Sequence, residues 1–431
     1  MARRLTDSES AIQPEFHPGV GRCWEKKYQI ELLTPMAGGG TASWKPDFGN
    51  PVRTQAIKGQ LRFWWRTMQP LPLFTSAQLK AAEDTFWGNT EGASPIRLNV
   101  LVNGQAQPVN IGWGGRGDNY LQFRDAGLPG YVLFPLQNSF DPEDECQLIA
   151  SGLSFTLTVQ CPNTAAVIET VKNTVKLWVL FGGLGARTTR GCGSLYCPEI
   201  MEDFPDGAAI KRFIDSVTPE GSPDLGSAPW PMLGNCKFGL ASIPAANDAQ
   251  QLWCTYLDQY GEFRQGGTYA REPGTARGRP GRSRWPEPDA IRRITGTFGT
   301  HQPRHGHQWF PRAAYGMPIE TSFNTRSDPT DPKGKFNLQP AGSPRWPSPF
   351  ILKVVKLANQ TLAKAWLLLN HSLPHDLVLR AAPPYSDYEL EGAEHPANYI
   401  GKQLLHGRTV PAVGTSPHQA LIDYLGIPEV P

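Results

Sequence analysis

The sequence predicts an α+β protein with many turns and long loops on a sheet-containing scaffold, and three observations support this prediction. Glycine (44) and proline (41) together make about a fifth of the 431 residues, which disfavours a helical bundle or a coiled coil. Hydrophobic residues make up 39% of the chain and include 13 tryptophans, enough to fill packed cores and to exclude a wholly disordered chain. Segments of alternating and of helical hydrophobic period both occur. The length predicts two or three domains.

The elements of the first half follow from these periods. Residues 27–34 alternate apolar and polar side chains, which is typical of a half-buried strand. Residues 36–53 form a long glycine-containing loop, and long loops in compact domains are often functional. Residues 55–68 change to helical period. The remaining predicted elements are helices at 76–87 and 164–181 and strands at 96–102, 153–160 and near 194–196.

This order predicts the domain organisation. Counted along the chain, residues 25–200 give β-α-β-β-α-β with an extra helix and a loop insertion, which is the ferredoxin-like order. Residues 201–232 are rich in proline, glycine and serine and indicate a linker. Residues 233–431 form the second domain, which opens with a strand at 236–243 and a helix at 248–263. Residues 350–357 and 361–369 favour a hairpin, although the period of the second arm also fits a helix.

Motifs that the sequence lacks lead to predictions about its cellular compartment and its cofactors. No apolar run is long enough to span a bilayer, and residues 1–7 are basic without the apolar stretch of a signal peptide. The seven cysteines are an odd number and form no CxxC pair, so we expect reduced thiols and a cytoplasmic protein. Three histidines at 301, 305 and 307 are poor metal candidates because they lie among arginines. We therefore expect no metal or cofactor.

Two basic features point to a polyanion. Lys58, Arg62 and Arg66 recur at four-residue spacing and form a stripe beside the apolar face of the helix at 55–68. Residues 264–312 contain ten arginines, no lysine and three acidic residues, a net charge of +7. Arginine forks suit phosphates, and the interleaved aromatic residues suit unstacked bases. A solvated surface loop is the alternative. The RNA-binding candidates in or beside this segment are Arg282, Arg284, Arg292, Arg293 and Arg312.

The glycine-rich segment 182–193 is the third candidate. Its glycines, Gly183 and Gly185 among them, would let backbone N–H groups approach phosphate oxygens, and Arg187 and Arg190 add charge. The segment follows a helix and lacks Gly-Lys-Ser/Thr, so it is neither a dinucleotide-binding fingerprint nor a P-loop. A purely structural glycine turn is the alternative, and both interpretations can hold together.

Several motifs, taken in order, resemble one known family. ELLTPMAGGG (31–40), IKGQLRFWWR (57–66) and GGLGARTTRGCGSL (182–195) are similar to the first-subunit family of Cmr-type (type III-B) CRISPR effector complexes, within the RAMP superfamily. Further similar segments lie at 283–292, 312–320 and 348–357. The resemblance is scattered over about residues 27–370 and adds little for the last part of the chain.

The resemblance implies two ferredoxin-like (RRM-like) RAMP domains with long inserted loops. It implies a non-enzymatic subunit that holds the 3′ part of the guide RNA, contacts the guide–target duplex and caps the filament of backbone RAMP subunits. By analogy, the loop 36–53, with Lys45 and Arg53, would insert into the duplex as a thumb. The expected partners are guide RNA, target RNA and other RAMP subunits, and no membrane.

Two other functions stay open. Related backbone RAMPs place an RNA-cleaving aspartate in the loop after the first strand, where Asp47 lies here. An RNA endonuclease that uses Asp47 or a histidine is therefore the first alternative, against a turn-making role for Asp47 beside Pro46 and Gly49. The second alternative is a protein-bridging subunit whose arginines bind acidic neighbours.

Overall fold

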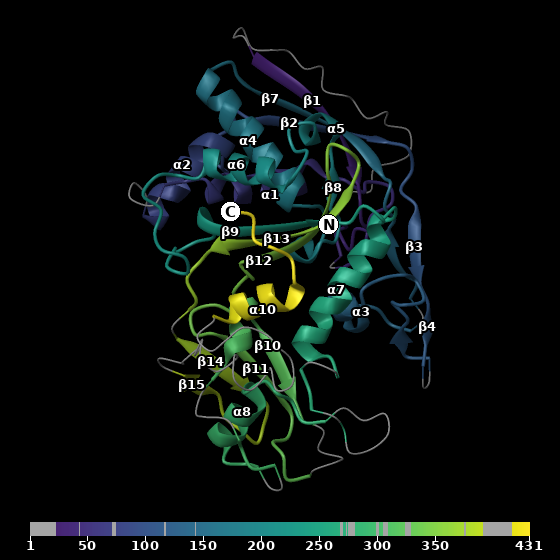
Figure 1. Cartoon of the computed structure of the whole chain (residues 1–431), viewed down its shortest axis with the longest axis vertical. Helices are drawn as coiled ribbons and strands as arrows, with labels where there is room; N and C mark the ends of the chain where they lie inside the picture. The colour runs from purple at the N-terminus through teal and green to yellow at the C-terminus, as the bar shows by residue number, and fades with distance from the viewer. Residues whose placement is uncertain are drawn as a thin grey trace.

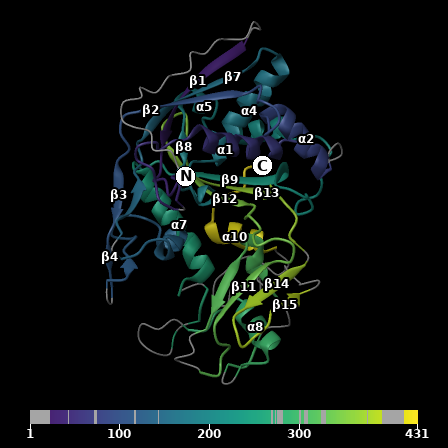
Figure 2. The ribbon, with the colours of Figure 1, turned by 180° about the vertical axis from the view of Figure 1, so that it is seen from behind.

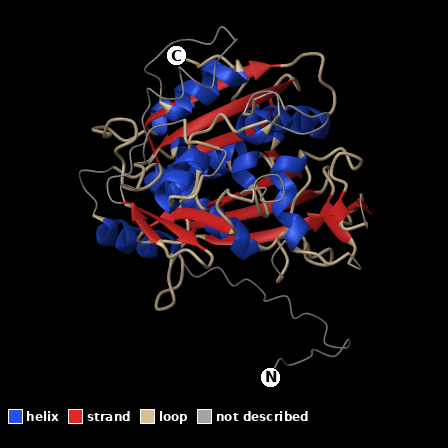
Figure 3. Cartoon of the chain, turned by 90° about the horizontal axis from the view of Figure 1, so that it is seen from below, coloured by secondary structure: helices blue, strands red, loops and turns tan. Residues whose placement is uncertain are grey.

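The computed structural model describes residues 23–431 apart from 43, 71–74, 116–117, 143, 268–269, 273, 275–280, 299–300, 305–308, 324–328, 375 and 391–415. Sheets and helices alternate along the long axis of the molecule (Figure 1). Seen from below, helices lie between layers of strands (Figure 3). None of the helices in the described part is long and apolar enough to cross a bilayer.

The first sheet has the strand order β2-β7-β1-β8, and all its neighbours are antiparallel. Its strands are β1 (Cys23–Leu32), β2 (Arg97–Asn103), β7 (Ser154–Pro162) and β8 (Leu195–Tyr196). Alternate residues of β7 are fully buried, among them Phe155 and Leu157, and burial of each contributes roughly 1.5–3 kcal/mol. With α1 and α4 in the two crossovers, the order is the β-α-β-β-α-β order expected for residues 25–200.

Helices α1 (Thr54–Thr67) and α4 (Ala165–Phe181) pack against the first sheet and against each other. The other helices of this part are α2 (Ser76–Trp87), which packs against α1, the short α5 (Pro198–Met201), and α6 (Gly207–Val217), which packs against β9. In α1 the buried residues Ile57, Leu61, Trp64 and Trp65 form the predicted apolar face. Residues 201–232 were predicted to be a linker, but helix α6 occupies part of this range and buries Ile210 and Ile214.

An arm is inserted between β2 and β7 and lies along one side of the molecule (Figures 1 and 2). It contains β3 (Pro108–Ile111), β4 (Trp113–Gly114), β5 (Tyr120–Leu121), α3 (Gly130–Leu133), the 3-10 helix η1 (Phe134–Asn138) and β6 (Cys146–Ile149). Strand β3 pairs with β6, and β4 pairs with β5. The arm returns to β1, since Met36 and Ile149 exchange backbone hydrogen bonds of 2.9 and 3.0 Å.

The second unit repeats much of this order. Strands β9 (Met232–Ser242), β12 (Phe350–Lys356) and β13 (Leu362–Asn370) form an antiparallel sheet in the order β12-β13-β9. Helix α7 (Ala249–Gln265) packs against it, and α10 (Pro417–Leu425) packs against α7. A bridge between Gly239 and Glu429 adds the end of the chain at the free side of β9. The order is again β-α-β-β-α, with a single bridge in the place of a fourth strand.

This second sheet is buried on both faces. Ile351 and Val355 of β12 face the core that contains α1 and α4, whereas Leu352 and Val354 face the core that contains α7 and α10. A strand with two apolar faces loses its alternation, which explains the ambiguous period of 361–369. That segment is a strand, so the helical alternative for it is wrong.

A third sheet has the order β10-β11-β14-β15. Its strands are β10 (Ile319–Ser322), β11 (Lys335–Pro340), β14 (Leu377–Ala381) and β15 (Tyr388–Leu390), and they lie near α8 (Glu287–Thr295) and the 3-10 helix η3 (Pro311–Tyr315). Strands β10 and β11 come from the segment before β12, and β14 and β15 from the segment after β13. Two insertions of the second unit thus combine into one small subdomain.

Candidate nucleic-acid interface

Two loops of the first unit are joined at the end of β1. Ala37, in the loop 36–53, accepts a hydrogen bond of 2.7 Å from the backbone N–H of Ala186 in the glycine-rich segment. Further along the first loop, the guanidinium of Arg53 donates to the carbonyl oxygen of Gly40 at 3.0 Å. Thr34 closes the junction, because its hydroxyl donates to Gly191 O at 2.6 Å and accepts from Ser194 N at 2.9 Å. The predicted thumb loop and the glycine-rich segment therefore form one surface.

The glycines of 182–193 serve close packing of the backbone. A Cβ at Gly185 would lie 2.4 Å from Ala37 O, and one at Gly183 would lie 2.7 Å from Gly193 O. Gly185 also has a φ of +78°, a conformation that glycine adopts without strain. Close packing of the protein backbone therefore requires glycine at these two positions, which fits the structural interpretation. A phosphate contact by their N–H groups stays a prediction.

Arg187 and Arg190 have opposite environments although they are three residues apart. Both flank or belong to the short 3-10 turn η2 (Thr188–Arg190). Arg187 is exposed, takes a left-handed conformation with a φ of +58°, and its guanidinium lies 5.8 Å from the ring centroid of Trp44. Left-handed backbone is costly for a residue with a Cβ and is concentrated at functional positions. Trp44 is half-buried and has a φ of +65°, so two strained residues meet on this surface.

Arg190 is buried, with 6% of its surface exposed. Its guanidinium donates to the Ser348 hydroxyl at 2.9 Å, the Tyr260 hydroxyl at 3.2 Å, the Tyr315 carbonyl at 3.3 Å and the Phe350 carbonyl. All these acceptors belong to the second unit or its insertion. The prediction that Arg190 contacts RNA does not fit this geometry, because the side chain instead joins the glycine-rich segment to the second unit.

The basic stripe of α1 is neutralised along most of its length. Arg62 and Arg66 both form ion pairs with Glu83 of α2, the second at 3.2 Å. Glu83 is buried, with 3% of its surface exposed, so its carboxylate is held in place beside the two arginines. Lys58 is half-buried and forms no ion pair with a described residue, while burial and the nearby Arg62 lower its pKa.

The start of α1 adds donors beside Lys58. Its N-cap residue, Arg53, makes no side-chain cap, and the first turn contains no acidic residue. Uncapped amides and the helix dipole favour an anion there. Lys45 lies on the same loop and pairs with Asp144 at 3.0 Å on the surface. Asp47 makes a turn, because one of its carboxylate oxygens accepts the N–H groups of Gly49 and Asn50, both at 3.0 Å.

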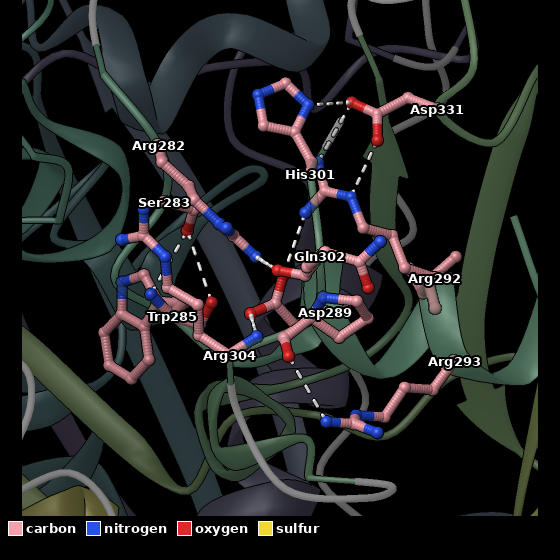
Figure 4. A network of polar contacts seen from close by, with 12 residues as sticks. Arg282, Ser283, Trp285, Asp289, Arg292, Arg293, His301, Gln302, Arg304 and Asp331 are labelled. Carbon is pink, nitrogen blue, oxygen red and sulfur yellow. Dashed lines mark hydrogen bonds and ion pairs between the residues drawn. The ribbon is translucent and has the colours of Figure 1, made fainter. Parts of the chain in front are cut away.

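The arginine-rich segment is mostly an internal ion-pair network (Figure 4). Arg292 is 5% exposed and binds Asp331 through two bonds of 2.7 and 3.0 Å, and Asp289 at 2.9 Å. Arg282 is largely buried and pairs with Asp289. Arg312 is 7% exposed and lies 3.1 Å from Glu287. Buried carboxylates already pair with the guanidinium groups of Arg282, Arg292 and Arg312, so the geometry does not support the prediction that these arginines bind RNA.

Two further arginines and the three histidines of this segment are described separately. Arg293 is exposed and donates to Pro303 O at 3.3 Å, and Arg284 is half-buried. His301 lies 3.1 Å from Asp331, while His305 and His307 fall outside the described residues. Within the described part no group of His, Cys, Asp and Glu side chains has the arrangement of a metal site.

Known proteins resemble the chain at the first unit. Residues 29–196, which span the first sheet and both joined loops, match the model of the RAMP superfamily. The CRISPR system Cmr subunit Cmr1-1 of Pyrococcus furiosus is 26% identical over 176 residues, which are 38% of this chain and 48% of that protein. This part of the chain is therefore similar to the RAMP superfamily and to a Cmr subunit. The matched part spans about half the length of that curated relative.

Two solved structures are also similar to this chain. The crystal structure of Cmr1 from Pyrococcus furiosus in its apo form is 15% identical and has a TM-score of 0.49, with 85% of this chain and 94% of that chain covered. A chain in the cryo-EM structure of the type III-B Cmr-beta complex bound to cognate target RNA is 14% identical, with a TM-score of 0.47 and coverages of 80% and 94%.

Sequence reasoning missed two residues that decide the site. Asp331 neutralises Arg292 from 39 positions away, and no local pattern links them. Trp44 contacts Arg187 from the other loop. The presence of a tryptophan beside Lys45 in a glycine-containing loop was the available signal for Trp44.

Proposed function

We propose that this protein is an RNA-binding subunit of a type III-B CRISPR antiviral ribonucleoprotein in the cytoplasm. It holds the 3′ part of the guide RNA and the guide–target duplex, and caps the filament of backbone RAMP subunits. Its two units are two ferredoxin-like RAMP domains, the second expanded by the insertion that forms the third sheet. The family match supports the class of protein, and the surface at the joined loops supports the RNA contact.

Two observations carry the proposal: the exposed Arg187 lies over Trp44, and Lys58 forms no ion pair with a described residue near the uncapped start of α1. A guanidinium and an ammonium without carboxylate partners suit the ribose-phosphate backbone, and an accessible aromatic ring suits a base. Arg53 lies on the same loop and joins the proposed contact set. Lys45 and Arg66 lie on the same loop and helix and are secondary members of the set, because they already pair with Asp144 and Glu83. Arg284 and Arg293 are kept as secondary candidates.

The test is RNA affinity as a function of salt. We expect Lys58→Gln with Arg187→Gln to weaken binding of the purified chain to single-stranded RNA equally for every sequence. Each lost phosphate contact should make the slope of log K against log salt shallower by about 0.7. The matched control is Arg345→Gln, an exposed arginine of the second unit. Unchanged affinity and slope, or a loss confined to one base identity, would contradict the proposal.

The endonuclease alternative has weaker support. The carboxylate of Asp47 is engaged in a turn with two backbone amides, which fits a structural role. Incubation of the chain with labelled guide precursor and with guide–target duplex separates the two functions. Cleavage that disappears in Asp47→Asn would favour the endonuclease, and no cleavage by either protein is expected.

A further inference from the structure

The short turn η2 has Arg187 directly before it and ends with Arg190, and backbone hydrogen bonds join the two residues. The carbonyl oxygen of Arg187 accepts the N–H of Arg190 at 2.9 Å and that of Cys192 at 3.4 Å. The two residues that flank the turn, Arg187 and Gly191, are both left-handed, with φ of +58° and +74°. The direction in which the Arg187 side chain leaves the turn is therefore tied to the position of Arg190.

Arg190 is held by the second unit at both its side chain and its backbone. Three of the acceptors of its guanidinium are Ser348, Tyr260 and Tyr315. Its carbonyl oxygen accepts the indole N–H of Trp253 in α7 at 2.8 Å, and Trp253 is fully buried. Residues of α7, of η3 and from just before β12 therefore fix one end of a turn that belongs to the first unit.

The next residue, Gly191, is enclosed in the same place. A Cβ at Gly191 would lie 2.9 Å from Nε1 of Trp253 and 3.1 Å from the carbonyl oxygen of Leu352 in β12. On the other side, the carbonyl oxygen of Gly191 accepts the hydroxyl of Thr34 at 2.6 Å. The turn is therefore packed between the end of β1 and the second sheet, and its backbone has little room to move.

The choice of a charged side chain for this join is unexpected. Arg190 forms no ion pair with a described residue, and its acceptor Tyr260 also receives a hydrogen bond of 3.4 Å from Arg264, a second buried arginine. Removal of a guanidinium from water costs free energy, and an apolar side chain of similar size would fill the space without that cost. The arginine adds direction, because its planar fork donates along several fixed axes at once.

Arg187 requires such support. Left-handed backbone is unfavourable for a residue with a Cβ, yet Arg187 adopts it where its guanidinium lies 5.8 Å from the ring centroid of Trp44. A cation–π contact at an exposed site is weak, so this contact alone does not hold the turn. The bonds of Arg190 are the stronger and the more deeply buried restraint.

We propose that Arg190 is a positioning residue for RNA binding, which holds Arg187 over Trp44 and so makes the RNA contact of the first unit depend on the second unit. This inference rests on the proposed function, because it concerns the same surface. Arg190 stays buried and does not touch RNA, whereas Arg187 binds the phosphate.

The experiment is a double-mutant cycle on the purified full chain, in which Arg187→Gln and Arg190→Lys are measured singly and together. The readout is affinity for a fluorescent single-stranded RNA of mixed sequence over a range of salt. We expect each single variant to bind about tenfold more weakly, the equivalent of one charge-assisted hydrogen bond, and to have a salt slope shallower by about 0.7. The double variant should bind no more weakly than Arg187→Gln alone.

The lysine variant separates position from charge, since it keeps the positive charge of Arg190 but not the fork. Hydrogen exchange without RNA gives a second readout: the amides of Gly191 and Cys192 should exchange faster in Arg190→Lys than in wild type. If Arg190→Lys does not fold, Ser348→Ala takes its place in the cycle, because it removes one acceptor of 2.9 Å. We expect it to weaken binding about twofold to threefold, with no further loss when it is combined with Arg187→Gln.

The matched control for general stability is Val354→Ala, which removes buried side-chain volume from β12. It should lower stability and leave RNA affinity and the salt slope at their wild-type values. An equal loss of RNA affinity in Val354→Ala would reduce the role of Arg190 to general stability and overturn the proposal.

The other outcomes are distinct. Unchanged affinity in Arg187→Gln contradicts the proposed RNA surface and this inference with it. A weakened Arg187→Gln beside an Arg190→Lys variant of wild-type affinity contradicts only this inference. Losses that multiply to about a hundredfold in the double variant would mean that the two arginines act independently, which also overturns it.

Discussion

The glycine-rich segment and the arginine-rich segment both contain arginines among glycines, but the arginines that we compare have different environments. In the first, Arg187 stays on the surface beside an aromatic ring. In the second, Arg292 and Arg312 are buried against carboxylates. The difference lies in the acids supplied by the fold, since Asp331 reaches Arg292 from another segment. Local density of arginine is therefore a poor guide to a phosphate site unless the acids that fold against it are known.

The largest expected effect comes from breaking the buried network. Asp331→Ala leaves Arg292 buried with one carboxylate fewer, and loss of one partner of a buried ion pair costs about 3–5 kcal/mol of unfolding free energy. Chemical denaturation measures this loss. Because the network faces inward, RNA affinity of the folded variant should remain within about twofold of wild type, well under the 1.4 kcal/mol that separates a tenfold change.

Asp387→Ala is the matched control, since Asp387 forms an ion pair with Arg380 at the surface of the third sheet. We expect it to change stability little. A fall in RNA affinity of the folded Asp331→Ala variant would contradict the comparison, because the arginine-rich segment would then contact RNA through this network.

The second expected effect concerns Lys353, a buried lysine next to the glycine-rich segment that forms no ion pair with a described acidic residue. Lys353 of β12 is 1% exposed, donates to Gly182 O, and burial lowers its pKa to about 7 from 10.5. Cys192 is the titratable group nearby, and burial raises its pKa to about 12. Below pH 7 both folded and unfolded chains hold the lysine proton. Between pH 7 and 10.5 only the unfolded chain does, so this residue makes stability rise with pH.

Lys353→Met removes that contribution. We expect the variant to be more stable than wild type at pH 6.5, and the difference to shrink by about 2 kcal/mol between pH 7 and 9, since one proton corresponds to about 1.4 kcal/mol per pH unit. Denaturant unfolding of both proteins at each pH measures it. The cysteines titrate in both proteins and cancel in the difference. A pH-independent difference would mean that Lys353 remains charged in the folded protein.

The sequence predicted what depends on local pattern. Alternation placed β1 and β7, and the helical period placed α1 with Trp64 and Trp65 on its buried face. It could not predict the third sheet, because two insertions far apart in the chain supply its strands. The fate of each arginine also depended on distant contacts: Glu83 neutralises Arg62 and Arg66 from α2. Lys58 and Arg187 form no ion pair with a described acidic residue, so RNA binding by them stays a prediction.

The smallest expected effect comes from removing the acid that neutralises the basic stripe of α1, so that the stripe becomes similar to the surface around Arg187. Glu83→Gln keeps the size of the side chain but removes the charge that neutralises Arg62 and Arg66 and one of the two oxygens that accept from them. With its acid removed, the stripe of α1 becomes the basic surface that the sequence predicted. We expect RNA affinity to rise by about two- to threefold at low salt, and the salt slope to steepen by about 0.7 for each arginine that gains a phosphate. Glu320→Gln frees Lys335 in the third sheet in the same way and should leave RNA affinity unchanged. Equal gains in both variants would mean that overall charge, and not the position of α1 beside the joined loops, controls RNA binding.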